Sequence, residues 1–346
     1  MSGSVIWTNG RVAIEGRDLW MVPYEYNVLC RYNINNGVLE HYSVWDDVHC
    51  QVAASYNVIN FNNMIIEVPA RENKIRLVCK DELVKEYEIA KETKLEHYSQ
   101  AVVVGDKLLL FPLEKNTIIE IDEKEIQEIP CPVNGISCAC VYDGYVFYSN
   151  NDNCIWKYDT STHISEKIEL HDEIQVCWIE IWKKNIILFS QNGKVLLAKN
   201  GNLNDLKKIA SAPEGDFFST GIIHENILIL FQMVDATRIW RLNLNEMSIE
   251  YDIIEKDTYW LDWPYNAFAV PVEKNGKIYV MSPKHRALFI YDIARNVLER
   301  KHLLLDKSTK VGFELLKQQL KLSKIVNECD LYTLDNCLAH LSGEIC

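Results

Sequence analysis

Long apolar runs are missing from this 346-residue chain, since no stretch approaches ~18 uninterrupted apolar residues. A membrane-spanning helix is therefore not expected. The N-terminal stretch MSGSVIWTNG also lacks the basic region and the apolar segment that a secretory signal peptide combines. We predict a soluble, cytoplasmic protein without a membrane partner.

Positive charge is scarce, because 36 Lys and Arg residues stand against 49 Asp and Glu residues, which gives a formal net charge of -13. The summed field of such an acidic protein repels phosphate backbones and anionic lipid headgroups. Nucleic acid is therefore not an expected partner. The hydrophobic content of 48% is enough for a full core.

Metal and cofactor motifs are also missing. The eleven cysteines are an odd number and lie mostly in apolar segments, as free thiols do in a reducing compartment. Cys138 and Cys140 are two residues apart, which places both on one face of a strand, but no second Cys or His pair follows at zinc-ligand spacing. We interpret this pair as packing and predict no metal and no cofactor.

Catalytic motifs are absent in the same way. No Ser or Cys stands in a nucleophile-elbow context, and no two histidines have the spacing of metal ligands on one helix face. Residues from separate loops can still converge in space, so the sequence leaves open whether the protein is an enzyme. The histidines in or near expected loops are His49, His97, His171, His224 and His285.

What the sequence does contain is a repeated hairpin pattern, clearest in SNNDNCIWKYD over residues 149–159. An apolar strand ends, a short turn follows, and a second strand ends on Tyr-Asp. Comparable turns recur seven times, at intervals of 37 to 49 residues. Their anchor positions are Asn27, Asn73, Asn116, Asn153, Gly193, Thr237 and Arg286.

Each copy extends to a unit of four short strands. In the fourth copy we expect strands over 137–142, 145–149, 154–158 and 164–169, with the dipeptide DG joining the first two, because a type I′ turn needs positive φ at both central residues. A period near ~40 to 50 with four strands per repeat is the signature of a β-propeller. We therefore predict an all-β fold, a seven-bladed β-propeller with four-stranded blades; six and eight blades are the alternatives.

The strand patterns add expectations about burial and ring closure. The first two strands of each unit are nearly continuous apolar runs, so we expect neighbouring blades to cover both of their faces. The third strand alternates, as at Ile118 and Glu120, so we expect one of its sides to approach solvent. The segment 5–8 is either the first inner strand or completes the last blade; we favour a last blade with its own fourth strand within 297–304.

The third strands WKYD (156–159) and FIYD (289–292) carry a resemblance to a known family. Over residues 5–305 the units resemble kelch or galactose-oxidase-type repeats, whose third strand reads apolar-apolar-x-Tyr-Asp. The resemblance implies a β-propeller. The double glycine that follows the second strand in kelch repeats is missing from every unit, so the resemblance carries over no functional residue.

After residue 305 the pattern changes to helical spacing. Ser308 can cap a helix that presents Phe313, Leu316 and Leu320 on one face, and a second short helix is expected over 331–341. We therefore predict two parts, a propeller over 1–305 and a C-terminal α-helical extension over 306–346. The extension packs against the propeller or, as alternatives, docks a partner or mediates homodimerisation.

One face of the propeller is the expected binding surface. In a propeller, the loops that enter each first strand share a face with the loops that join second to third strands. Here these loops are rich in carboxylates and aromatic rings, most densely in YWLDWPYN over 259–266. Rings beside acids suit sugars and cationic side chains. The predicted binding residues are Trp260, Asp262, Trp263, Tyr265, Tyr24, Tyr26, Trp45, Asp46, Asp47, His49, Asp172, Asp216 and Phe218.

These features support two functional hypotheses. The first is a non-catalytic protein-binding or scaffold module that holds a cationic or peptide segment on the acidic-aromatic face. The alternative is a carbohydrate-active enzyme of epimerase, mutarotase or lyase type, in which acids and a histidine from several blades meet at the central channel and a glycan is the ligand. Fold alone does not choose between them, because propellers host both.

Overall fold

The structure, a computed structural model, describes residues 5–6, 8, 10–24, 28–44, 55–70, 74–79, 82–89, 98–122, 125–170, 174–261 and 266–304. Within this part of the chain, no helix combines the length and the apolar character that a bilayer crossing requires. The predicted C-terminal helices over 306–346 lie outside the described residues.

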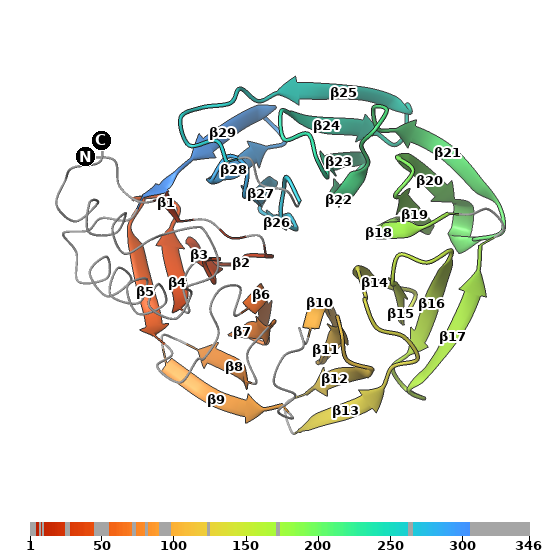
Figure 1. Ribbon diagram of the computed structural model, residues 1–346, viewed down its shortest axis with the longest axis horizontal. Helices are drawn as coiled ribbons and strands as arrows, with labels where there is room; N and C mark the ends of the chain where they lie inside the picture. The colour runs from red at the N-terminus through yellow and green to blue at the C-terminus, as the bar shows by residue number, and fades with distance from the viewer. Residues whose placement is uncertain are drawn as a thin grey trace, which may run out of the picture.

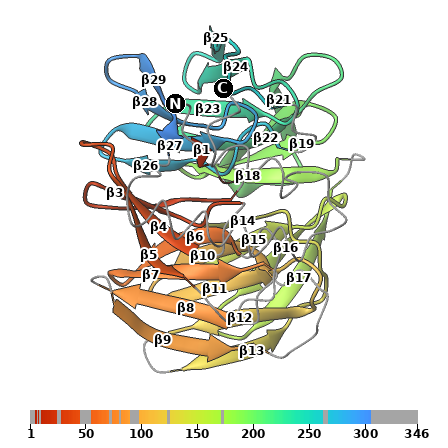
Figure 2. The same ribbon diagram turned by 60° about the vertical axis from the view of Figure 1, so that its left-hand side comes forward.

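Seven four-stranded antiparallel sheets follow one another along the chain and stand around a common centre (Figure 1). In each sheet the strands are hydrogen-bonded in sequence order, from an innermost first strand to an outermost fourth strand. Figure 2 shows the same blades from a second direction. The predicted seven-bladed β-propeller is therefore confirmed, and the alternatives of six and eight blades are excluded.

The strands of the first four blades are short. Blade 1 contains β2 (Ala13–Glu15), β3 (Asp18–Met21), β4 (Val28–Asn33) and β5 (Leu39–Val44). Blade 2 contains β6 (Ser55–Phe61), β7 (Met64–Pro69), β8 (Lys74–Cys79) and β9 (Glu82–Glu88). Blade 3 contains β10 (Tyr98–Val104), β11 (Lys107–Pro112), β12 (Thr117–Ile121) and β13 (Ile126–Pro130). Blade 4 contains β14 (Cys138–Tyr142), β15 (Tyr145–Ser149), β16 (Cys154–Asp159) and β17 (Ile164–Glu169).

The last three blades continue the same order. Blade 5 contains β18 (Val176–Trp182), β19 (Asn185–Ser190), β20 (Lys194–Ala198) and β21 (Leu206–Ser211), with the 3-10 helix η1 (Lys199–Gly201) before β21. Blade 6 contains β22 (Phe218–His224), β23 (Ile227–Gln232), β24 (Arg238–Asn243) and β25 (Ser248–Ile253). Blade 7 contains β26 (Val272–Lys274), β27 (Lys277–Ser282), β28 (Ala287–Asp292) and β29 (Val297–Lys301).

Tight turns join the first and second strands of the blades. In blade 4, Asp143 and Gly144 have φ values of 51° and 79°, which is the type I′ backbone that the Asp-Gly pair predicted. Blade 2 uses Asn62 and Asn63, with φ values of 50° and 58°, because asparagine tolerates the left-handed region better than most residues. These turns set the register of each hairpin.

Burial is high in the second strand of each blade and not, as expected, in the first two strands alike. In β11, β19, β23 and β27 every residue after the first is buried. The innermost strands β10 and β14 are mostly half-buried, because they border the central channel and lack a neighbour on that side. The fourth strands β17 and β25 are mainly exposed.

The third strand of blade 3 is also more buried than its alternation predicted. In β12, Ile118 and Glu120 are both buried, so Glu120 does not approach solvent. Its carboxylate instead forms an ion pair with Lys107 of β11, whose Nζ lies 2.6 Å from Glu120 Oε1. A charged residue in an alternating pattern can therefore face a neighbouring blade when a partner neutralises it.

Neighbouring blades are joined by hydrogen bonds beside the innermost strands. Ser149 Oγ of blade 4 donates to the carbonyl of Val176 in blade 5 at 3.0 Å, and Cys177 Sγ of blade 5 donates to the carbonyl of Phe218 in blade 6 at 3.5 Å. Cys177 is the extra residue of a β-bulge, as is Ser99 in blade 3. Such a bulge re-aims a side chain, here toward the next blade.

The ring is closed by a separate two-stranded ribbon. β1 (Val5–Ile6) pairs antiparallel with β30 (Leu303–Leu304), and blade 7 has its own fourth strand, β29. The expectation of a fourth strand within 297–304 is therefore confirmed. The two alternatives for the N-terminal segment are both wrong, because β1 is neither an inner strand nor part of a blade. The red and blue ends of the ribbon meet at this point in Figure 1.

Candidate functional site

Four of the predicted binding residues lie in the described part of the chain: Tyr24, Asp216, Phe218 and Trp260. The others lie outside it, so their roles stay predictions: Tyr26, Trp45, Asp46, Asp47, His49, Asp172, Asp262, Trp263 and Tyr265. We name as the loop face the side of the ring where each first strand begins and where second strands are joined to third strands.

The structure brings Tyr24 and the segment around Trp260 to neighbouring blades of the loop face. Tyr24 and Leu261 pack against the same cluster of buried residues from blades 1 and 7. Trp260 packs against the next cluster, formed by blades 6 and 7. The backbone N–H of Leu261 donates to the carbonyl of Lys284 at 2.7 Å, which connects the entry to blade 7 with the loop between β27 and β28.

The indole ring of Trp260 contacts the ring of a buried histidine, His285. Its ring stands edge-on to the ring of His285, with centroids 4.9 Å apart. His285 has no exposed surface, and its Nε2–H donates to the carbonyl of Ala236 at 2.8 Å. Burial lowers the pKa of His285, so this ring is a neutral platform for Trp260.

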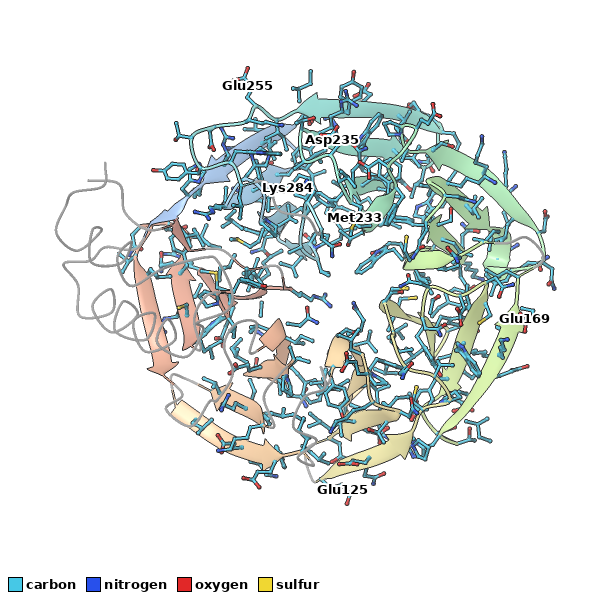
Figure 3. The ribbon with its side chains drawn as sticks, viewed as in Figure 1. Glu125, Glu169, Met233, Asp235, Glu255 and Lys284 are labelled. Carbon is cyan, nitrogen blue, oxygen red and sulfur yellow. The ribbon has the colours of Figure 1, made fainter. Side chains whose placement is uncertain are left out.

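Two lysines lie over the Trp260 ring. Lys256 Nζ is 4.3 Å from the ring centroid and Lys284 Nζ is 6.0 Å from it, within the range of cation–π attraction. Lys284 is only 7% exposed, and it has no ion pair or hydrogen bond from its ammonium group among the residues that the structure describes. Figure 3 shows where Lys284 lies relative to Asp235 and Met233 of the adjacent blade.

An acid of the same segment, Asp257, already has basic partners. Asp257 Oδ2 lies 2.8 Å from His302 Nε2 and 3.3 Å from Arg300 Nη1, while its Oδ1 accepts the backbone N–H of Tyr259 at 2.9 Å. The described surroundings of Trp260 are therefore aromatic and basic, whereas the sequence predicted an acidic-aromatic surface.

Asp216 and Phe218 occupy places inside the fold. Asp216 accepts four hydrogen bonds, from the backbone N–H groups of Phe217, Val234 and Asp235 and from the side chain of Gln232. Its carboxylate thus ties two loops of blade 6 together. Phe218 is 1% exposed and meets Trp240 edge-on at 6.0 Å, so its ring contributes to packing.

The central channel brings together two charged residues from distant repeats. Arg11 lies two residues before β2 of blade 1, and Glu180 lies in β18 of blade 5. These blades are not neighbours in the ring (Figure 1), yet each charge acts on the pKa of the other. The two charges therefore interact, although the repeats that carry them are far apart in the sequence.

Burial dominates the protonation of this pair. It raises the pKa of Glu180 to about 7, although a hydrogen bond from Trp178 and the charge of Arg11 both favour the carboxylate. Burial also lowers the pKa of Arg11, and the charge of Glu180 offsets part of that effect. Trp178 Nε1 donates to Glu180 Oε1 at 2.9 Å. A carboxyl group with this pKa exchanges a proton near neutral pH.

Neighbouring groups set the position of the pair. The backbone N–H of Arg11 donates to Asn57 Oδ1 at 2.9 Å, and the carbonyl of Arg11 accepts the N–H of Val58 at 2.9 Å. Blade 2 thus fixes the backbone of Arg11.

In blade 4, Cys138 and Cys140 are free thiols. Burial raises the pKa of both thiols, and the carboxylate of Glu180 adds to the rise.

No group of three or more His, Cys, Asp or Glu side chains is arranged for a metal ion among the described residues. Neither Arg11 nor Glu180 is among the residues expected from the sequence. Glu180 did leave a signal, because it is the one charged residue of the otherwise apolar strand VCWIEIW. Nothing in the sequence around Arg11 marks it in this way, since no local pattern shows which distant residue its charge acts on.

Comparisons with known proteins define the class of this fold. No protein-family profile and no curated protein sequence matches the chain. Among solved structures, a streptogramin B lyase matches with a TM-score of 0.64 and 12% identity, over 87% of this chain and 95% of the lyase. YCF48 bound to D1 peptide matches with a TM-score of 0.62 and 11% identity, over 87% of this chain and 95% of YCF48.

A third similar structure is Sqt1 from Saccharomyces cerevisiae, with a TM-score of 0.60 and 8% identity over 86% of this chain and 88% of Sqt1. At these identities the likeness extends to the fold alone. The chain is thus similar to β-propellers, one of which was solved with a bound peptide and one of which is a lyase. The more specific kelch resemblance stays a prediction.

Proposed function

We propose that the protein is a non-catalytic binding module that holds a protein partner on its loop face, with Trp260 as the central contact. The observation that carries this proposal is the indole of Trp260, which is half-buried, contacts a buried histidine and has two lysines over its ring. Tryptophan is enriched where binding energy concentrates in protein interfaces. A ring that is fixed before binding also loses little conformational entropy on binding.

The two lysines indicate the chemistry of the partner. Lys256 and Lys284 already occupy the cation–π positions over Trp260, so a further cation gains little there. A peptide that places a carboxylate beside an apolar or aromatic residue satisfies the ammonium groups and the indole together. We therefore propose an acidic-apolar peptide segment at this position. The cationic segment and the glycan expected from the sequence are the alternatives.

A second exposed apolar feature is a row of side chains on the outer edge of blade 6. Ile249, Tyr251 and Ile253 alternate along β25, which places them on one side of the strand, and Ile253 is 72% exposed. β25 is the fourth strand of its sheet, so its outer backbone edge has no partner strand within the described sheets. Exposed apolar edges of this kind are typical of protein contacts.

The structural comparisons support a binding role in general terms. YCF48 has a similar fold and was solved bound to a peptide. This similarity makes peptide binding compatible with the present architecture and carries no residue of that protein over to this one.

An affinity experiment tests the proposal. The intact protein, Trp260→Ala and the matched control Ile164→Ala are immobilised and exposed to lysate of the source cells, and retained proteins and small molecules are identified by mass spectrometry. Ile164 is exposed on the fourth strand of blade 4, far from Trp260 in the ring. We expect a protein that both the wild type and the control retain and that Trp260→Ala loses.

Charge reversal then tests the kind of partner. Lys256→Glu together with Lys284→Glu is expected to abolish retention of an acidic-apolar segment and to leave a cationic segment bound. Retention that is unchanged in Trp260→Ala and in the charge-reversed variant would contradict the proposal.

A carbohydrate-active enzyme of epimerase, mutarotase or lyase type is the second candidate, and Glu180 is the observation that favours it. A carboxyl group with a pKa of about 7 suits general acid-base work. Glycoside hydrolysis uses two carboxyl groups. Within the described residues, no second carboxylate contributes to the pKa shift of Glu180. A co-purifying sugar without a protein partner would favour this candidate.

A further inference from the structure

Blade 5 carries a surplus of positive charge in an acidic protein. Residues 176–211 contain six lysines and no arginine against two acids, Glu180 and Asp205, which is a surplus of four positive charges in a chain with a formal net charge of -13. All six lysines are exposed: Lys183, Lys184, Lys194, Lys199, Lys207 and Lys208. The surface of this blade therefore differs in sign from the protein as a whole.

The charges of these lysines are not neutralised. Among the described residues, none of the six ammonium groups has a hydrogen bond or an ion pair within 4.0 Å. Lys183 Nζ lies 4.7 Å from the centroid of the Trp182 ring, which positions the ammonium group without compensating its charge. Blade 7 has an equal surplus, with seven basic and three acidic residues over 272–301, but four of its cations are ion-paired: Lys277, Arg295, Arg300 and Lys301.

The strand register places five of the lysines at one end of the blade. Ile186 of β19 pairs with Ala198 of β20, which in turn pairs with Leu206 of β21. Two lysines precede the first of these positions, one follows the second and two follow the third. Neighbouring strands are about 4.8 Å apart, so the three strands span about 10 Å. We name these residues the blade 5 lysine patch: Lys183, Lys184, Lys199, Lys207 and Lys208.

Hydrogen bonds hold the two loops of the patch together. The backbone N–H of Asn200 donates to Asn185 Oδ1 at 3.0 Å, which joins η1 to the start of β19. The hydroxyl of Tyr142 in blade 4 donates to the carbonyl of Lys184 at 2.9 Å. The same tyrosine ring lies against Gly201, where an added Cβ atom would meet it at 3.0 Å. The backbone of the patch is therefore fixed before a partner binds, which limits the entropy lost on binding.

We infer that the blade 5 lysine patch is a second interaction surface, which binds a short acidic segment of a partner protein. The carboxylates of such a segment supply the negative charge that the described chain does not place beside these lysines. The patch lies on the face of the ring opposite the loop face, because it is formed where first strands are joined to second strands and third strands to fourth strands. It is therefore separate from Trp260 and does not depend on the proposed function.

The small extent of the patch favours a short peptide over a nucleic acid or a membrane surface. At physiological ionic strength, exposed charges act over about 8 Å, so a short segment experiences mainly the lysines. A longer phosphate backbone or an anionic bilayer extends beyond them. It then meets the exposed acids Asp143 and Glu225 in the first turns of blades 4 and 6, which flank blade 5 (Figure 1), and the acidic remainder of the chain.

Fluorescence anisotropy with labelled hexaglutamate tests this inference on the full chain. At about 0.1 M salt we expect a Kd below about 1 mM for hexaglutamate and no binding of hexaglutamine, which has no charge. Single-stranded DNA of about 20 nucleotides and vesicles of phosphatidylserine with phosphatidylcholine are the probes for the other occupants. Absence of hexaglutamate binding at about 1 mM, or tighter binding of either of the other two probes, would overturn the inference.

Matched charge reversals locate the site. Lys184→Glu with Lys199→Glu is expected to weaken hexaglutamate binding by about tenfold, because two attractive contacts become repulsive. The control is Lys85→Glu with Lys194→Glu, which changes the net charge equally. Its two lysines are also exposed, but one lies in β9 of blade 2 and the other at the opposite end of β20. The control should bind as the wild type does, and equal weakening of both variants would overturn the assignment.

A third variant distinguishes this surface from the one around Trp260. If Lys256→Glu with Lys284→Glu weakens hexaglutamate binding while Lys184→Glu with Lys199→Glu does not, the acidic segment lies on the loop face and the inference about blade 5 is wrong. The lysate experiment with Trp260→Ala has a separate readout, so the failure of one surface is distinguishable from the failure of the other.

Discussion

Val5 pairs with Leu304, and this contact between the two ends of the propeller closes the ring outside any blade. In the same ribbon Ile6 pairs with Leu303, whose side chain is fully buried against the core of blades 1 and 7. The ribbon therefore joins the first blade to the last one by backbone pairing and by apolar packing.

The ring closure predicts that stability depends strongly on Leu303, at the end of the ring. Leu303→Ala is expected to lower the free energy of unfolding by about 2–5 kcal/mol, because it leaves a cavity beside the blade 1 core. Urea unfolding followed by circular dichroism measures this change. Val297→Ala is the matched control, since Val297 is 52% exposed and should change stability by less than about 0.5 kcal/mol. Equal effects of the two changes would contradict a closing role for the ribbon.

The ion pair between Lys107 and the buried Glu120 in blade 3 leads to a second prediction. Lys107→Met leaves the buried carboxylate of Glu120 without its partner at 2.6 Å, and should lower stability by about 3 kcal/mol. The double variant Lys107→Met with Glu120→Leu should recover most of the loss, because no unpaired charge then remains. A double-mutant cycle by urea unfolding measures the coupling, and additive effects of the two changes would argue against it.

Close packing between blades 5 and 6 gives a third prediction. A Cβ atom on Gly221 would lie 2.7 Å from Phe189 Cζ and 2.9 Å from the carbonyl oxygen of Ile229. Gly221→Ala should therefore destabilise the protein by about 1–3 kcal/mol through overpacking. Shortening the neighbour in Gly221→Ala with Phe189→Leu should return part of the stability. Thermal unfolding of the three proteins tests this, and a single variant as stable as the wild type would contradict the contact.

Glu180 leads to a fourth prediction, on pH. Its pKa rises from 4.5 to about 7 on folding, so the native state holds a proton that the unfolded state releases between these values. The contribution of Glu180 to stability is therefore unfavourable above pH 7 and vanishes below pH 4.5. Relative to Glu180→Gln, the wild type should lose about 2 kcal/mol of stability between about pH 5 and about pH 8. Urea unfolding of both proteins at the two pH values measures this, and parallel pH profiles would contradict the shift.

Much of the fold could be predicted because its determinants are local. The strands of blade 4 and the turn at Asp143 and Gly144 follow from the alternation of apolar residues and from the positive φ that Asp-Gly tolerates. Seven copies of such a unit indicate a closed ring, since each blade needs two neighbours to cover its faces. Burial of individual strands was predicted less well, because it depends on the neighbouring blade.

The site could be predicted only in part. The choice of Trp260 as a binding residue stays a prediction, and two of its neighbours, Lys284 and His285, come from another segment of the chain. Asp216 looked like a free acid in the sequence, but the backbone N–H groups of another loop surround it. Sequence distance conceals such contacts, since loops of one face converge from separate blades.

By itself, the sequence determined the number of blades, the four strands of each and the turns between them, because hairpins form from residues close together in the chain. Only the tertiary structure decided how the ring closes, which charges are buried and which charges of distant blades interact. Arg11 and Glu180 lie at opposite sides of the ring, and Val5 and Leu304 at its two ends. Their proximity depends on the curvature accumulated over all seven blades, which no local pattern encodes.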